Sequence, residues 1–287
     1  MEVTAKRSKL WYSATTLLAL QMLLVVTGGL VRVTGSGLGC PTWPKCTENS
    51  YVPEKSQSHI HVWIEFGNRM LTFALFAAAL ATLIFAWKRR ELRTLALLQF
   101  FGIFGQGILG GITVLTKLNP IPVAGHLLLS MLLIAGAAVL QFKVNDYQVI
   151  ENNQENNQEN IQREERLAKL LAAIGFLTLI AGTVVTGSGP HAGDWQAPRF
   201  DFNIELAAKI HSALVAITLM LATYIAIKFP RKEVNLLILV IFAQGFIGII
   251  QWWLGLPQAL VGLHLLGAAL FWLATWRTRM SFKYQRL

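Results

Sequence analysis

Charged side chains are scarce in this sequence. Asp, Glu, Lys and Arg make up 14% of the 287 residues, whereas 54% are hydrophobic. A soluble domain carries charges at roughly a quarter of its positions, so the composition excludes an ordinary soluble protein. The apolar residues gather in blocks of about 20, the length that crosses the ~30 Å hydrocarbon core of a bilayer as a helix. The sequence therefore predicts a multi-pass membrane protein.

Eight apolar blocks are predicted to be transmembrane helices, because backbone polar groups in lipid have no water to bond and must pair within a helix. The first block lacks a small-residue cleavage site, so we interpret it as a retained anchor and not as a signal peptide. The expected fold class is all-α. The blocks are 11–33, 63–87, 95–115, 123–142, 167–185, 204–227, 235–254 and 260–280.

Acidic residues are fewer than basic ones, 15 against 25, which gives a net charge of +10. Such an excess can indicate a nucleic-acid partner, but here the basic residues gather in both tails and in every second connection. That is the positive-inside pattern of membrane proteins. It predicts cytoplasmic N and C termini, four outer connections, a lipid bilayer as partner and no nucleic acid. The basic clusters lie at 6–9, 88–93, 163–169, 228–232 and 277–286.

An internal repeat divides the chain. Residues 104–128 align without a gap on residues 242–266, and ten of the 25 pairs are identical. A second repeated motif is "VTGSG", which occurs at 33–37 and again at 185–189. These repeats predict two pseudo-symmetric four-helix bundles, an N-terminal half at 1–142 and a C-terminal half at 167–287. The Asn-, Gln- and Glu-rich stretch between them predicts a disordered cytoplasmic linker at 143–166.

Three histidines lie inside predicted helices at one depth. His126 and His264 are a repeat pair, and His211 lies near the start of the sixth helix. Two imidazoles at one depth on facing helices are typical of axial haem ligation. The alternative is that each histidine hydrogen-bonds across helices. We favour ligation, with the strongest case for His211 and His264. The remaining histidines, which are His59, His61 and His191, lie in outer loops and are predicted to be solvated.

The matching place in the second helix carries Glu65, Asn68 and Arg69. A carboxylate inside a membrane helix is costly and usually faces a cavity or a partner. One interpretation of Glu65 is an ion pair with Arg69, one helical turn away. The other is acid–base or charge-stabilising work beside a bound substrate, in which case Arg69 could meet an acidic group of that substrate.

The two cysteines of the chain, Cys40 and Cys46, lie in "CPTWPKC" in the first outer connection. The pair could be half of a zinc site. A disulfide is favoured because the outer side of a bacterial membrane is oxidising and the short loop can be closed.

Together these features resemble the haem A synthase family of the cytochrome oxidase assembly pathway. The resemblance covers nearly the whole chain: eight helices in two halves, "VTGSG" after the first helix, the cysteine pair, Glu65, and the histidines at 126, 211 and 264. It implies an oxidoreductase of the bacterial cell membrane that converts the C8 methyl of haem O to the formyl of haem A. It also implies partners such as haem O synthase and cytochrome oxidase assembly factors.

The resemblance also implies roles for particular residues. His211 and His264 would hold a haem b, and His126 would hold the haem O substrate with Glu65 beside the reacting methyl. Asn68 stands where better-known members carry a histidine, three residues after the glutamate. Substrate haem would then be held by His126 alone, or by His126 with another partner such as His61. Asn68 and Arg69 are further candidates for contact with this haem.

Two other functions use some of the same features. A di-haem cytochrome that takes electrons from quinol would need the histidines but neither Glu65 nor the cysteines. A transporter would suit the repeats and the intramembrane charge, but the histidines near the outer face do not outline a substrate path.

Overall fold

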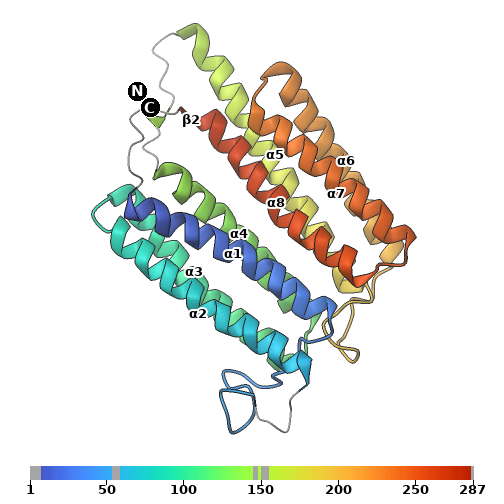
Figure 1. Ribbon diagram of the computed structural model, residues 1–287. Coiled ribbons are helices and arrows are strands. Elements are labelled where there is room, and N and C mark those ends of the chain that lie inside the picture. The colour runs from blue at the N-terminus through green and yellow to red at the C-terminus, as the bar shows by residue number, and fades with distance from the viewer. Residues whose placement is uncertain (1–7, 54–58, 145–147, 150–154, 286–287) are drawn as a thin grey trace, which may run out of the picture.

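The computed structural model describes residues 8–53, 59–144, 148–149 and 155–285, which form eight long helices (Figure 1). All eight are long and apolar enough to cross a membrane. Each overlaps one predicted block, so the expected all-α fold with eight spans is confirmed. The helices are α1 Lys9–Val33, α2 Ile60–Ala86, α3 Arg90–Leu115, α4 Pro120–Lys143, α5 Glu155–Ser188, α6 Ile204–Lys228, α7 Lys232–Trp253 and α8 Gln258–Lys283.

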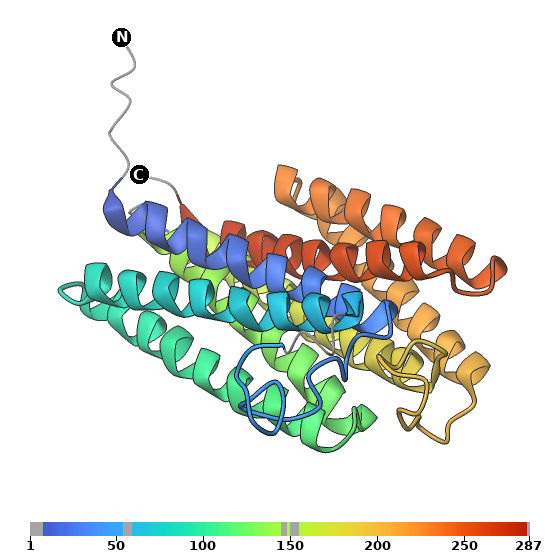
Figure 2. The same ribbon diagram turned by 60° about the horizontal axis from the view of Figure 1, so that its bottom comes forward.

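The helices pack as two groups of four. In the first group, α1 and α3 each contact both α2 and α4; in the second group, α5 and α7 each contact both α6 and α8. Within a group, α2 therefore lies diagonally across from α4, and α6 lies diagonally across from α8. The groups meet where α1 and α4 pack against α8 and where α4 packs against α5, as Figures 1 and 2 show.

The interface between the groups has its own apolar core. Small alanines allow α1, α4 and α8 to approach closely, and the indole Nε1 of Trp272 donates a 2.7 Å hydrogen bond to the carbonyl of Met131. The two groups therefore form one packed unit. The buried residues of this core are Leu18, Val25, Met131, Ile134, Ala135, Ala137, Ala138, Ala269, Trp272 and Met280.

The repeated segments form the same turn in both groups. The α3–α4 connection places Lys117 and Leu118 at φ values of 51° and 61°, and the α7–α8 connection places Gly255 and Leu256 at 74° and 62°. In both turns the leucine amide donates to the carbonyl five residues earlier, at 2.7 and 2.6 Å, which ends a helix with left-handed residues. The pseudo-symmetry of the complete halves stays a prediction.

The prediction of a disordered linker at 143–166 is wrong where the structure describes it. Residues 155–166 form the first turns of α5, and Glu165 pairs with Lys169 at 3.0 Å one turn on. Strand β1, Gln148–Val149, pairs antiparallel with β2, Tyr284–Gln285. Glu, Gln and Arg are good helix formers, so a polar composition here indicates a solvated helix. Residues 145–147 and 150–154 lie outside the described part of the chain.

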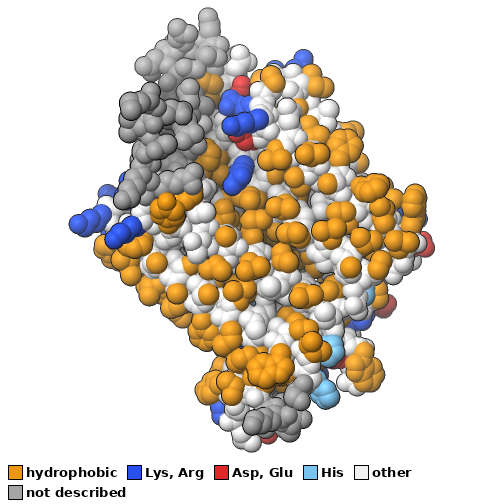
Figure 3. Space-filling view, viewed as in Figure 1, with side chains coloured by type: hydrophobic (Ala, Val, Ile, Leu, Met, Phe, Trp, Pro, Cys, Tyr) orange, Lys and Arg blue, Asp and Glu red, His pale blue; other side chains and the backbone are white. Residues whose placement is uncertain are grey.

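The start of α1 and strand β2 lie at one end of the molecule, which we call the terminal end (Figure 1). The opposite end, called the loop end, carries residues 34–53 and the connections 116–119, 189–203 and 254–257. Figure 3 shows hydrophobic side chains across the middle of one face, with several Lys and Arg side chains toward the terminal end. That the terminal end faces the cytoplasm stays a prediction.

Candidate functional site

Three histidines and one asparagine lie at similar positions near the loop end of their helices. His126 and His264 each follow the first residue of their helix by six positions, His211 by seven and Asn68 by eight. All four side chains are half-buried. The four residues therefore lie at matching positions along their helices, and their common depth in the membrane stays a prediction.

His211 on α6 and His264 on α8 face each other across the second group. Their ring centroids are 6.4 Å apart and the ring planes are inclined at 77°. Two imidazoles that ligate one metal ion at ~2 Å each have centroids about 6 Å apart. The pair is thus spaced to hold a single ion between the rings.

The other ring nitrogen of His211 is already engaged. Its Nδ1 lies 3.0 Å from the carbonyl oxygen of Thr178 on α5, which fixes the ring and leaves Nε2 for a ligand. A backbone carbonyl behind a histidine is a common support for a metal ligand, because it sets the tautomer and the orientation of the ring.

Glycines make room for each imidazole. Every one of the three rings rests on a glycine of the preceding helix; a Cβ would crowd the ring at Gly110 and Gly182 and would be in ordinary van der Waals contact at Gly248. The Cβ positions that could be built on Gly110, Gly182 and Gly248 lie 3.2, 3.3 and 3.5 Å from Cε1 of His126, His211 and His264.

Two ring nitrogens are buried without a partner. Nδ1 of His126 and Nδ1 of His264 have no hydrogen bond within the described residues. Leaving a buried polar atom unpaired costs about 1–3 kcal/mol. Together with the ring spacing and the glycine contacts, these atoms fit a site that a bound group completes, such as the expected haem.

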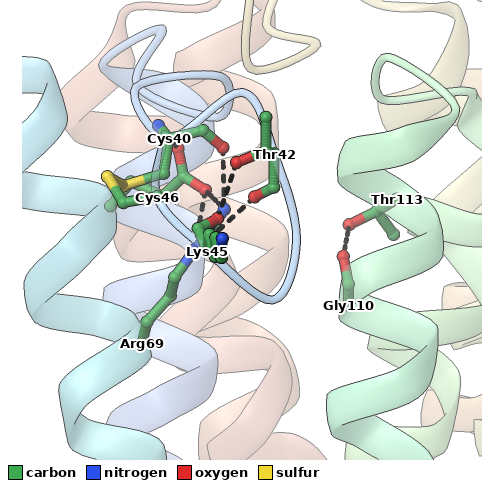
Figure 4. Close-up of polar contacts among 8 residues, drawn as sticks. Cys40, Thr42, Lys45, Cys46, Arg69, Gly110 and Thr113 are labelled. Carbon is green, nitrogen blue, oxygen red and sulfur yellow. Dashed lines mark hydrogen bonds and ion pairs between the residues drawn. A yellow bond between two sulfur atoms is a disulfide. The ribbon is translucent and has the colours of Figure 1, made fainter. Parts of the chain in front are cut away.

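Arg69 ties helix α2 to the first long connection. Its Nη1 donates to the carbonyls of Thr42 and Lys45 at 3.1 and 3.2 Å, and its Nη2 donates to the carbonyl of Cys40 at 2.8 Å. In Figure 4, Arg69 extends from α2 toward the loop that carries these residues. The remaining N–H groups of Arg69 bond to Glu65, so all five donors have acceptors in the protein.

Glu65 is buried beneath the same loop. Its Oε1 accepts from Nε and Nη2 of Arg69 at 3.1 and 2.5 Å, and its Oε2 accepts from the amide of Cys40 at 2.6 Å. The ion pair that the sequence offered as one interpretation is therefore present. The acid–base interpretation is not tested by these contacts.

Cys40 and Cys46 form the expected disulfide, with a sulfur–sulfur distance of 2.00 Å, and both residues are buried. The alternative of a zinc half-site is therefore wrong. The disulfide loop also packs onto α3, because a Cβ on Gly111 would lie 2.5 Å from the indole of Trp43. The loop thus covers the loop end of the first group.

Asn68 is held by helix α1. The hydroxyl of Thr27 lies 2.7 Å from Oδ1 of Asn68, and Nδ2 lies 4.0 Å from the Cβ position of Gly28. His61, at the first turn of α2, is exposed and has its Nδ1 2.9 Å from the hydroxyl of Ser36.

A polar tie between the groups was missed in the sequence. Arg32, near the end of α1, donates to the carbonyls of His191 and Thr186 at 2.6 and 2.9 Å. The ring of His191 in turn contacts the carbonyl of Leu256 at 2.7 Å, so the prediction that His191 is only solvated is wrong. Polar side chains bond to whatever carbonyl the fold brings near, and the one visible signal was an arginine inside a membrane helix.

The structure brings the predicted site residues together in two clusters. Glu65, Arg69 and the cysteine pair converge at the first group, and His211 and His264 converge in the second. Among the described contacts, none joins His126 to either cluster.

The eight apolar helices lie in two groups, with facing imidazoles in one group and a disulfide-closed loop over the other, and they define a multi-pass membrane protein. The profile of the family described as cytochrome oxidase assembly protein matches residues 10–193. The chain belongs to this family.

Named relatives are similar to parts or most of the chain, and each is called "Heme A synthase". The protein of Bacillus pumilus is 33% identical over 43% of this chain and 41% of its own length. That of Lysinibacillus sphaericus is 32% identical over 61% and 58%, so the chain spans less than two thirds of both. That of Shewanella oneidensis is 25% identical over 88% and 90%. These bacterial relatives and the eight spans make this a multi-pass protein of the plasma membrane.

Proposed function

We propose that this protein is an oxidoreductase that converts haem O to haem A for the biogenesis of cytochrome oxidase. The observation that carries the proposal is the facing pair His211 and His264 at a haem-ligating distance of 6.4 Å, in a chain of the cytochrome oxidase assembly protein family. The name of its relatives, "Heme A synthase", supplies the product.

The proposed reaction changes one methyl group. The C8 methyl carbon loses two of its three C–H bonds and gains the formyl oxygen from water, through an alcohol and a hydrate that loses one water. The balance is a methyl plus one water giving a formyl, four protons and four electrons. The electrons leave to an electron acceptor of the membrane, and haem O synthase and assembly factors are the expected partners for supply and delivery.

The second group is the proposed site of a resident haem b. His211 and His264 would hold its iron, and the carbonyl of Thr178 would hold the His211 ring in place. When bound, this haem takes up electrons and passes them on.

The first group is the proposed substrate site. His126 would hold the haem O iron, because its ring lies in the position of His264 in the repeat and has an unpaired buried nitrogen. Asn68 is a further proposed contact of this haem. A contact between Arg69 and the substrate stays a prediction, since the described bonds occupy all five of its N–H groups.

Glu65 is the proposed catalytic residue. Removal of electrons from a methyl carbon builds positive charge there, and a fixed carboxylate nearby stabilises that charge. The carboxylate could also orient or deprotonate the attacking water. Its bonds to Arg69 and to the amide of Cys40 would hold it in position during the reaction.

The first test is the pigment content of the purified protein. Haem A or an hydroxylated haem O should be extracted beside haem b, whereas a quinol-oxidising cytochrome would yield only its resident haem. Replacement of His211 or His264 by Leu should remove the low-spin spectrum of the resident haem. Retention of that spectrum in both variants would show that the haem is bound elsewhere.

Glu65→Gln tests the chemistry. The amide keeps the shape but removes the charge, so conversion of haem O to haem A should fall by about 10² or more, the scale of a lost acid–base group. The resident haem spectrum and the disulfide serve as controls for folding and should be unchanged. Conversion at the parental rate would leave Glu65 as a structural partner of Arg69 alone.

A further inference from the structure

Asn68 occupies in the first group the place that His211 occupies in the second. Each residue lies on the second helix of its group, seven or eight positions from the helix start, and next to a glycine of the preceding helix. Each also lies on the helix diagonally opposite the one that carries the repeat-related histidine, which is His126 or His264. The two groups therefore present the same pair of positions, filled by two imidazoles in one and by an imidazole and an amide in the other.

The contacts of Asn68 orient its amide. Oδ1 lies 2.7 Å from the hydroxyl of Thr27, which also lies 3.0 and 3.3 Å from the carbonyls of Leu23 and Leu24. Nδ2 is the end of the amide that points away from Thr27. Nδ2 has no hydrogen-bond acceptor among the described residues. An amide nitrogen carries two N–H donors and no free electron pair, so it cannot ligate iron. It can only donate a hydrogen bond to something else in the site.

His61 is placed too far along α2 to replace the missing imidazole. It precedes Asn68 by seven residues, which is about 10 Å along a helix. Its ring is exposed and its Nδ1 lies 2.9 Å from the hydroxyl of Ser36 in the loop. Among the described residues, no other histidine lies on the diagonal from His126.

From these positions we propose that haem bound in the first group is held by His126 alone, and that its second axial position is an open site for a small exogenous ligand. Asn68 faces that ligand and donates a hydrogen bond to it from Nδ2, with Thr27 holding the amide in place. The inference rests on the proposed function, because that function puts a haem in the first group. It adds that the two haem sites of one chain differ in their access to small ligands.

The second group is an internal control for this proposal. There both axial positions are filled, since the rings of His211 and His264 are 6.4 Å apart. A small ligand has no position on that iron unless a histidine leaves. The first group and the second group should thus respond differently to the same probe in the same sample.

The experiment uses carbon monoxide on the reduced full-length protein and cyanide on the oxidised protein, in detergent, with absorption spectroscopy. We expect the haem that depends on His126 to bind carbon monoxide and the haem that depends on His211 and His264 not to bind it. In Asn68→His the first site should become low-spin and lose carbon monoxide affinity by at least tenfold. In Asn68→Ala binding should persist, with carbon monoxide released about fivefold faster, the factor of one ordinary hydrogen bond.

A reciprocal variant tests the same idea in the second group. His211→Asn recreates there the arrangement of the first group, and it should make the second haem bind carbon monoxide. If haem is present in the first group but is low-spin and binds no carbon monoxide, the open position is wrong while the proposed function stands. If His126→Leu leaves the haem content unchanged, no haem depends on His126, and the proposed substrate site itself fails.

Discussion

At the scale of single residues, Arg69 shows how one side chain can organise a loop. A guanidinium has five N–H donors in a fixed plane, and here each has an acceptor, three of them loop carbonyls. The loop carbonyls would otherwise lie near the membrane without a donor. Lys cannot replace this pattern, because an ammonium has three donors and no planar fork.

Arg69→Lys should therefore loosen the disulfide loop. Loss of at least one charge-assisted bond, worth about 1.5–3 kcal/mol, should open the loop at least tenfold more often. Cys40 and Cys46 are buried, so the measurement is the rate at which a mild water-soluble reductant makes them available to a maleimide. Arg90→Lys, on an exposed side chain at the terminal end, is the control and should leave the rate unchanged. An equal rate in both variants would mean that Arg69 does not hold the loop.

The sequence predicted some residue contacts and missed others for a physical reason. The pairs Glu65–Arg69 and Cys40–Cys46 are close in the chain, so helix geometry and loop length predict them. Arg32 instead bonds to backbone carbonyls more than 150 positions away. No residue type marks a backbone acceptor, so that contact follows only from the three-dimensional fold.

At the scale of helices, the glycines beneath the imidazoles set how close neighbouring helices come. The Cβ position on Gly182 lies 3.3 Å from Cε1 and 3.5 Å from Nδ1 of His211. A methyl group there presses on the ring and on its bond to the carbonyl of Thr178. Gly245 on α7, by contrast, has nothing within 4 Å of its Cβ position.

Gly182→Ala should therefore turn or shift the His211 ring by a few tenths of an ångström. For the proposed haem between His211 and His264, the expected result is a changed electron paramagnetic resonance signal, because that signal depends on the relative orientation of the two rings that hold the iron. Gly245→Ala is matched in chemistry and should give the parental signal. Identical signals from Gly182→Ala and the parent would show that the glycine does not position the ring.

The helices themselves could be predicted well from the sequence, and their ends less well. Every apolar block became a helix, but polar residues extend several of them. Asn119 and Asn203, for example, cap α4 and α6 by accepting from Ile121 and Leu206. The first turns of α5 were not predicted, because hydrophobicity indicates which residues can be buried in lipid and does not identify a solvated helix.

At the scale of the whole molecule, two kinds of contact join the groups. Apolar packing joins α1, α4 and α8 through the middle of the structure, and polar bonds join the loop end. Besides Arg32, the amide of Gly37 donates to the carbonyl of Gly193 at 2.8 Å. The repeat predicted that there are two groups, but apolar patterning alone does not tell which helices of one group face the other.

Arg32→Met should weaken the interaction between the two four-helix groups. It removes two charge-assisted bonds across the interface, together about 3 kcal/mol, and should lower the thermal midpoint by several degrees. Arg90→Met is the control, since Arg90 begins α3 and its side chain is exposed. If both variants melt alike, the Arg32 bonds do not join the groups.

The short turns at 116–119 and 254–257 have a consequence for how the chain enters a membrane during synthesis. So little chain separates α3 from α4, or α7 from α8, that each pair must leave the insertion machinery together as a helical hairpin. Within the first hairpin, Gln106 already donates to the carbonyl of His126 at 3.1 Å and to the hydroxyl of Ser130 at 2.5 Å. The N–H groups of the Gln106 side chain are therefore paired within the hairpin when it enters the lipid. This pairing does not depend on the other six helices.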